Sequence, residues 1–147
     1  KTQIELWGIE TDRVVFTPRL MVSKEEEQNR IAKYLSSYKL ADLFLDTWPY
    51  NAGTTAVDAL WAGLPVLTKV GLSMGARMAA GPLYQLEMNE LITHSPKEYQ
   101  SLAIELANDS AKLNCSCKLS LEGTIIAVIY SCLSPIKNNW SIFGDFR

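Results

Sequence analysis

The stretch LDTWPYNAGTTAVDALWAGLPVLT, residues 45–68, determines the fold that we predict for this sequence. It starts inside one apolar run, LFLD at 43–46, and ends in another, PVLT at 65–68. Between them, a turn rich in Pro, Asn and Gly leads into a helical segment that begins at Thr54 or Thr55. Apolar runs of this length without alternation are typical of strands buried on both faces. We therefore predict two parallel strands joined by a short helix.

Upstream of this stretch the sequence predicts further helices and strands. Residues 1–8, KTQIELWG, indicate the end of a helix, with Gly8 free to take the left-handed conformation that closes it. RVVF at 13–16 is rich in β-branched residues and predicts another buried strand. Ser and Glu three residues apart, at 23–26, form a capping box, which predicts that a helix begins there.

Downstream, the alternation of strands and helices continues. Residues 74–80 are helix-like, and we expect the Gly-Pro pair at 81–82 to interrupt that helix. ELIT at 90–93 predicts a strand, and SPKE at 95–98 predicts a second capping box with Pro at the first helical position. Strands and helices that alternate through short links indicate a parallel sheet covered by helices. The expected fold class is α/β, a doubly wound parallel sheet.

The character of the sequence changes near residue 113. Residues 113–147 lack a helical period and contain all three cysteines and one β-rich run. We expect this atypical tail to be poorly integrated with the domain formed by residues 1–112. Because residue 1 is not Met and falls inside a helix-like segment, we read the chain as part of a longer protein.

The composition fits one globular domain and argues against several kinds of partner. The 147 residues are 48% hydrophobic with a formal charge of −2, so no basic excess points to nucleic acid or to an anionic membrane. The longest apolar run, 124–133, is about half of the roughly 20 residues that a membrane helix needs. The spacing of the cysteines fits no zinc pattern and predicts no metal site, and their odd number favours a reduced, cytoplasmic setting.

The predicted helix start at Thr54 and Thr55 is the strongest candidate site. Ligands of open parallel sheets bind beyond the carboxyl ends of the strands, and the loop after the first apolar run places this helix there. The free N–H groups of a helix N-terminus attract anions, above all phosphate. Gly53 allows a ligand close to the backbone, the Thr hydroxyls can bind phosphate oxygens, and Asp58 can accept hydrogen bonds from ribose hydroxyls. These residues indicate a nucleotide-diphosphate site.

Each candidate residue also has a purely structural explanation. Thr hydroxyls are normal helix caps, and an acid in the first turn suits the helix dipole. Trp48, Tyr50 and Trp61 fit a sugar pocket, although packing is the commoner role of aromatic residues. Arg77 suits either a phosphate contact or a surface salt bridge, and His94 suits an exposed loop.

The stretch LADLFLDTWPYNAGTTAVDALWAGLPVLT at 40–68 closely resembles the C-terminal catalytic lobe of the O-GlcNAc transferase family, glycosyltransferase family 41. The resemblance continues in GIETDRVVFTP (8–18), GARMAAGPL (75–83) and ELITHSPKEYQSLAIELAND (90–109), and it covers about residues 1–112. It implies a Rossmann-like fold, the donor-binding C-terminal lobe of a GT-B enzyme. Such enzymes transfer N-acetylglucosamine from UDP-GlcNAc to Ser and Thr of proteins, and they need neither a metal nor a cofactor.

The resemblance also implies roles for particular residues. Thr54 and Thr55 match the Thr pair that binds the UDP phosphates in the family, and Asp58 matches the acid that binds the ribose. Gly53 stands where many members have His, which removes one hydrogen-bond donor near the phosphates. Lys24 matches a Lys that lies against uracil, although an exposed, solvated Lys also explains it.

By the same resemblance, no catalytic residue is expected within the chain, because the family's catalytic Lys lies upstream of residue 1. We expect the N-terminal lobe and the tetratricopeptide repeats to lie outside the chain too, so that the chain alone is inactive. The implied setting is the cytoplasm, and in some members the nucleus, and the implied partners are a nucleotide sugar and protein acceptors. Two alternatives stay open: a protein O-fucosyltransferase that uses GDP-fucose, and a noncatalytic nucleotide-binding module.

Overall fold

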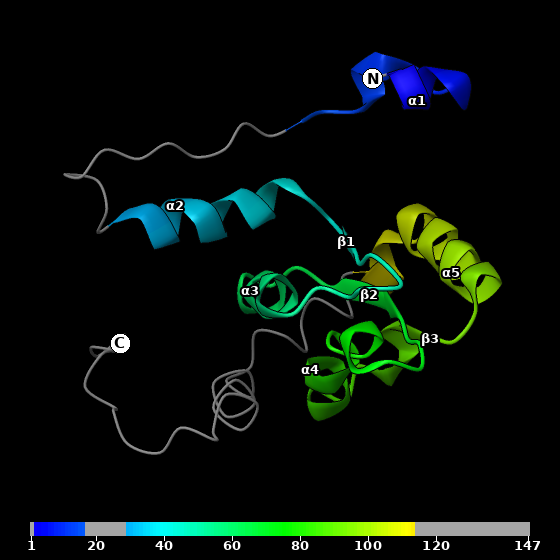
Figure 1. Cartoon of the computed structure of the whole chain (residues 1–147). Helices are drawn as coiled ribbons and strands as arrows, with labels where there is room; N and C mark the ends of the chain where they lie inside the picture. The colour runs from blue at the N-terminus through cyan, green and yellow to red at the C-terminus, as the bar shows by residue number, and fades with distance from the viewer. Residues whose placement is uncertain (1, 17–28, 114–147) are drawn as a thin grey trace. The chain divides into compact units, whose positions relative to one another are not determined.

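The structure is a computed structural model that describes residues 2–16 and 29–113 (Figure 1). The chain divides into two compact units, Lys1–Tyr34 and Leu35–Arg147. Lys24 and all but the first residue of the predicted tail lie outside the described residues. The boundary between a domain at 1–112 and a tail at 113–147 therefore stays a prediction.

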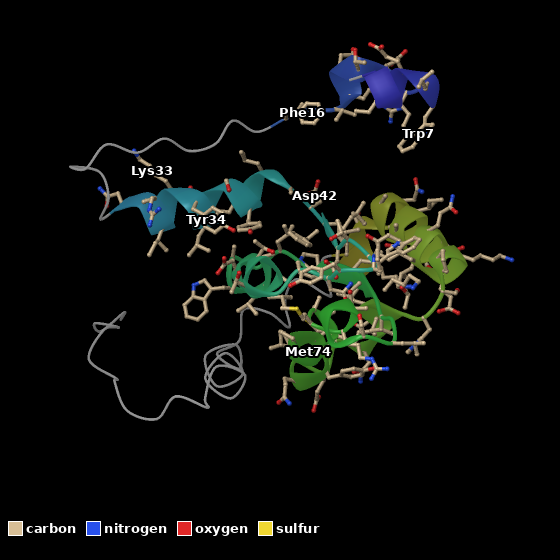
Figure 2. All side chains as sticks on the ribbon, viewed as in Figure 1. Trp7, Phe16, Lys33, Tyr34, Asp42 and Met74 are labelled. Atoms are coloured by element: carbon tan, nitrogen blue, oxygen red, sulfur yellow. The ribbon has the colours of Figure 1, made fainter. Side chains whose placement is uncertain are left out.

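The first unit contains two short helical segments, α1 (Thr2–Leu6) and the 3₁₀ helix η1 (Thr11–Arg13). Gly8 closes α1 as predicted, with a φ of 71° and an N–H that donates to Glu5 O at 2.9 Å. The predicted strand at 13–16 is wrong. Residues 14–16 belong to no helix or strand, and Val15 and Phe16 are 85% and 65% exposed. The Phe16 side chain is labelled in Figure 2.

The helix predicted to follow the capping box at 23–26 is α2 (Arg30–Ser37), which continues into the 3₁₀ helix η3 (Tyr38–Leu40). The capping box lies outside the described residues, so the position at which it opens a helix is untested. In α2 itself no residue is fully buried, although Tyr34 and Leu35 are half-buried.

The second unit is built on a parallel sheet whose described strands follow the order β1 (Phe44–Leu45), β2 (Val66–Lys69) and β3 (Ile92–Thr93). Phe44 pairs with Val66 and Thr68 pairs with Ile92, so that β1 and β3 flank opposite halves of the central strand β2. β1 and β3 fall within predicted apolar runs, and β2 extends one residue beyond its run at 65–68, to Lys69. The parallel pairing confirms the predicted fold class. Burial on both faces holds for β2 but not for β1, where Leu45 is 54% exposed.

Besides the end of α2 and η3, the described helices of this unit are α3 (Thr54–Trp61), α4 (Ala80–Gln85) and α5 (Pro96–Asn108), with 3₁₀ helices η4 (Met74–Ala76) and η5 (Asn89–Leu91). Figure 1 shows α4 and α5 on different sides of the three strands, as expected for a doubly wound sheet. None of the helices that the structure describes is long and apolar enough to cross a membrane. The core between helices and sheet is aliphatic, and its buried members include Ala56, Ala59, Leu60, Val66, Leu83, Met88, Leu91 and Leu106.

The prediction for residues 74–82 is wrong in detail. A 3₁₀ helix replaces the predicted α-helix, and Ser73 Oγ accepts a hydrogen bond from Ala76 N–H at 3.3 Å there. The true helix, α4, starts at Ala80 and runs through the Gly-Pro pair that was expected to interrupt it. Pro82 is tolerated because it lies in the first turn, where a backbone N–H has no partner within the helix.

The second capping box opens α5 as predicted. Ser95 Oγ accepts a hydrogen bond from Glu98 N–H at 3.2 Å, and Pro96 is the first helical residue. The Glu98 carboxylate bonds His94 N–H at 2.9 Å, one residue earlier than in the usual box. This bond is the main reason that the pKa of Glu98 is lowered from its ordinary value.

Candidate functional site

The loop between β1 and α3 is anchored by Asp46, which immediately follows β1 and is only 3% exposed. Its Oδ1 accepts a hydrogen bond from Ala52 N–H at 2.7 Å, and its Oδ2 accepts one from Thr68 Oγ1 at 2.6 Å. The Asp46 carbonyl oxygen accepts a further bond from the Tyr99 hydroxyl at 2.8 Å. One residue thus joins the far end of the loop, the central strand and α5.

Asn51 holds the middle of the same loop. Its side chain is fully buried, and its Nδ2 donates to Thr47 O at 2.8 Å and to Lys69 O at 3.3 Å. Its backbone N–H donates to Gly75 O at 2.7 Å. The loop is therefore fixed to the end of β2 and to η4, which gives the following helix a defined starting position.

The helix that starts after this loop, α3, has an open N-terminus. Gly53 is its N-cap and offers no side chain, and no side-chain hydrogen bond caps the helix. Thr54 and Thr55 occupy the first turn, are exposed, and make no hydrogen bond through their hydroxyls within the described part of the chain. The explanation of this Thr pair as helix caps is therefore wrong, and the hydroxyls are available to a ligand beside the first amides of the helix.

Gly53 is tightly enclosed on one side. A Cβ atom built on Gly53 would lie 2.5 Å from the Cε methyl of Met78, in the segment between η4 and α4. Asp58 lies one turn beyond the Thr pair on α3, at a half-buried position. The structure thus places Gly53, Thr54 and Thr55 at the start of α3 and Asp58 further along the same helix. The explanation of Asp58 as an acid in the first turn is therefore wrong, and Lys24 lies outside the described residues.

Cationic and aromatic side chains lie at the neighbouring strand end. Lys69 Nζ lies 5.0 Å from the centre of the Trp48 ring and donates to Val70 O at 3.3 Å. Arg77 Nε donates to Gly71 O at 2.7 Å, and no ion pair of Arg77 occurs among the described residues, so the salt-bridge explanation of Arg77 is not supported there. His94 is exposed, as predicted.

The aromatic residues near the site are largely exposed. A Cβ atom built on Gly75 would lie 3.0 Å from ring atoms of Tyr50, so one edge of this ring lies against η4, but Tyr50 is 70% exposed and the packing explanation is not supported for it. Trp48 and Trp61 remain about half exposed. Tyr99 is half-buried, and burial raises the pKa of its hydroxyl, with the nearby charge of Asp46 adding to the effect.

A parallel α/β sheet with an uncapped helix N-terminus at its carboxyl edge is the arrangement typical of proteins that bind nucleotides or other phosphate compounds. Comparisons with known proteins narrow this broad class of phosphate-binding proteins to one family. The family model of glycosyl transferase family 41 matches residues 1–122, and the chain belongs to this family. The predicted resemblance is thereby confirmed, and with it the class of glycosyltransferase.

Individual relatives agree with this assignment. The chain is 36% identical over 106 residues to a UDP-N-acetylglucosamine–peptide N-acetylglucosaminyltransferase of Caenorhabditis elegans, a match covering 72% of this chain and 8% of that protein. It is 30% identical over 116 residues to a probable enzyme of the same name, SPINDLY, of Oryza sativa subsp. japonica, covering 79% of this chain and 12% of that protein. The chain thus spans about a tenth of the length of the curated relatives it matches.

The fold is also shared with a solved structure. A mutant of the Thermobaculum terrenum O-GlcNAc transferase superposes on the chain with a TM-score of 0.66 at 26% sequence identity. The match covers 89% of this chain and 25% of that one. The chain therefore has the fold of part of a GT-B glycosyltransferase, as predicted.

Proposed function

We propose that the chain is the donor-binding part of a protein O-GlcNAc transferase, which transfers N-acetylglucosamine from UDP-GlcNAc to Ser and Thr hydroxyls of acceptor proteins. Relatives that bear this activity in their names support the proposal. The structural observation that carries it is the open N-terminus of α3. Because Gly53 caps the helix without a side chain, the amides of the first turn and the hydroxyls of Thr54 and Thr55 are available to a diphosphate.

In this proposal the residues of the chain bind UDP and stabilise it as a leaving group. The amides and the two Thr hydroxyls donate hydrogen bonds to the diphosphate oxygens, and Asp58 accepts hydrogen bonds from the ribose. Lys24 lies against uracil. When the bond to the sugar breaks, negative charge grows on the diphosphate, and the partial positive charge of the helix N-terminus stabilises it.

The remaining parts of the reaction are assigned to the rest of the protein. The chain contributes no catalytic residue in this proposal, and the catalytic Lys, the N-terminal lobe, the acceptor site and tetratricopeptide repeats come from elsewhere. The small share of each relative that the chain spans supports this division. We propose that neither a metal nor another cofactor takes part, and that the protein works in the cytoplasm or nucleus.

Calorimetry of the intact protein with UDP tests the proposal. Replacing both hydroxyls in Thr54→Val/Thr55→Val should weaken binding by about 1–3 kcal/mol, the usual value of hydrogen bonds to a charged group. Ser101→Ala, which removes an exposed hydroxyl on α5, is the matched control and should bind UDP like the wild type. Equal affinities of the Thr double variant and the wild type would contradict the proposed site. UDP affinity should also persist in EDTA, since no metal is invoked.

The same titration distinguishes the two alternatives. A protein O-fucosyltransferase would bind GDP-fucose in preference to UDP-GlcNAc, although both donors present a diphosphate to Thr54 and Thr55. A noncatalytic module would bind UDP in the intact protein without transferring sugar to any acceptor. We favour UDP-GlcNAc because the relatives are named for that donor.

A further inference from the structure

A second concave site lies beside the proposed UDP site. It is a cavity of about 700 Å³ at the carboxyl ends of β2 and β3. Lys69 at the end of β2 and residues 70–72 after it form one wall, α4 with the preceding Arg77 forms another, and His94 after β3 completes the lining. The proposed function does not use this cavity, since Thr54, Thr55 and Asp58 are not among its lining residues.

The charged side chains that line the cavity are Lys69 and Arg77. No described Asp or Glu lines it, although the Glu98 carboxylate accepts a hydrogen bond from the N–H of His94 at its edge. Neither Lys69 nor Arg77 forms an ion pair within the described ranges. The Arg77 guanidinium is held at one nitrogen only, by the bond from Nε to Gly71 O. Its two terminal nitrogens therefore carry donors in the fork geometry that suits a carboxylate.

The remaining lining is mostly apolar and ranges from the buried Ala80 to the exposed Leu72 and Tyr84. Leu72 is 94% exposed and Tyr84 is 54% exposed. Met74, which follows this wall in the chain and is labelled in Figure 2, is 86% exposed. A cavity of this volume accommodates a ligand of drug size, much larger than a single phosphate or carboxylate. The occupant that matches both the charge and the apolar walls carries acidic groups and hydrocarbon side chains together.

We propose that this cavity docks an acidic peptide segment of a partner protein. An Asp or Glu carboxylate of the segment binds between Arg77 and Lys69, and a neighbouring apolar side chain packs on Leu72 and Tyr84. The inference goes beyond the proposed function and does not depend on it, because the lining residues differ from those assigned to UDP.

Fluorescence anisotropy of the intact protein with a labelled peptide of alternating Glu and Leu tests the inference, against a peptide with Gln in place of Glu. The acidic peptide should bind at least about tenfold more tightly than the Gln peptide, and salt should weaken it. Arg77→Gln and Lys69→Gln should each reduce its affinity by about tenfold, and Arg77→Lys should recover part of the loss. Lys39→Gln removes an exposed cation that lines a different cavity, and this control should leave the affinity for the acidic peptide unchanged.

Thermal melting of each variant checks that it is folded. Equal affinity for the two peptides, or no response to Arg77→Gln in a folded variant, would overturn the inference. Displacement of the peptide by UDP or by inorganic phosphate would also overturn it and would assign the cavity to phosphate. Failure of UDP to bind anywhere would count against the proposed function alone.

Discussion

The terminal methyl of Met78 occupies the space in which a side chain at position 53 would begin. A Cβ atom built on Gly53 would lie 2.5 Å from Met78 Cε, closer than real Cβ contacts come. Gly53 is also the N-cap of α3, directly before the proposed diphosphate site. Since the resemblance implies that many members carry His at this position, Met78 fills the room that such a side chain would need here.

Gly53→Ala should therefore destabilise the protein by about 1 kcal/mol, because Ala is a poor N-cap and the added methyl displaces the flexible end of the Met78 side chain. In the double variant Gly53→Ala/Met78→Ala the clash is gone, so the two effects should be non-additive by about 0.5 kcal/mol or more. Urea denaturation of the two single variants and the double variant measures this coupling. Strict additivity would show that the two side-chain positions do not compete for space.

Thr68→Val should be costly although the side chain keeps its shape. The Thr68 hydroxyl donates to Asp46 Oδ2 at 2.6 Å, and both residues are buried. Removal of the donor leaves a buried carboxylate oxygen without that partner, with an expected loss of about 1–3 kcal/mol in the free energy of unfolding. The same change at Thr54, which is exposed, should leave stability within about 0.5 kcal/mol of the wild type.

Denaturant unfolding compares the two variants directly. The two variants also separate effects on stability from effects on binding. Thr54→Val is expected to lower the affinity for UDP, and Thr68→Val is expected to lower the free energy of unfolding. A Thr68→Val protein as stable as the wild type would mean that the bond from Ala52 N–H is sufficient for the Asp46 carboxylate.

The sequence predicted those elements whose signals are local. The strand β2, the helix α3 and the start of α5 follow from an apolar run, from a Gly and Thr pair, and from a capping box, all read over a few residues. The strand at 13–16 failed because a strand needs a neighbour, and β-branched residues alone do not supply one. The predicted interruption at Pro82 was wrong because the effect of Pro on a helix depends on whether it lies in the first turn or further inside.

The same distinction between local signals and distant contacts holds for the residues of the candidate site. Gly53, Thr54 and Thr55 could be recognised as a helix N-terminus from their order in the chain. The residues that hold the loop could not be recognised, because Asp46 and Asn51 act through partners 22 and 18 residues away. An acid directly after an apolar strand was the one available signal for Asp46, and it carries no information about Thr68. Met78 gave no signal, since its contact with Gly53 depends on the path of the chain after η4.

Glu98→Gln should change the acid dependence of stability. The Glu98 carboxylate bonds His94 N–H in the folded state, which lowers its pKa below the value in the unfolded chain. As the pH falls through the carboxyl range, the unfolded chain binds a proton first, so stability decreases until the folded form is protonated as well. Melting temperatures should therefore favour the wild type at neutral pH and converge with those of Glu98→Gln in acid. A constant difference across this range would contradict the bond as the source of the lowered pKa.

Tyr99→Phe should change how the stability of the protein depends on pH in the alkaline range. The Tyr99 hydroxyl donates to Asp46 O at 2.8 Å, and its loss should cost about 0.5–1.5 kcal/mol at neutral pH. Burial and the charge of Asp46 raise the pKa of Tyr99, so the unfolded chain loses the phenolic proton first as the pH rises. The wild type should accordingly lose part of its advantage over Tyr99→Phe above the ordinary pKa of tyrosine. Melting temperatures of both proteins from neutral to alkaline pH measure this difference, and an advantage that grows with pH would contradict it.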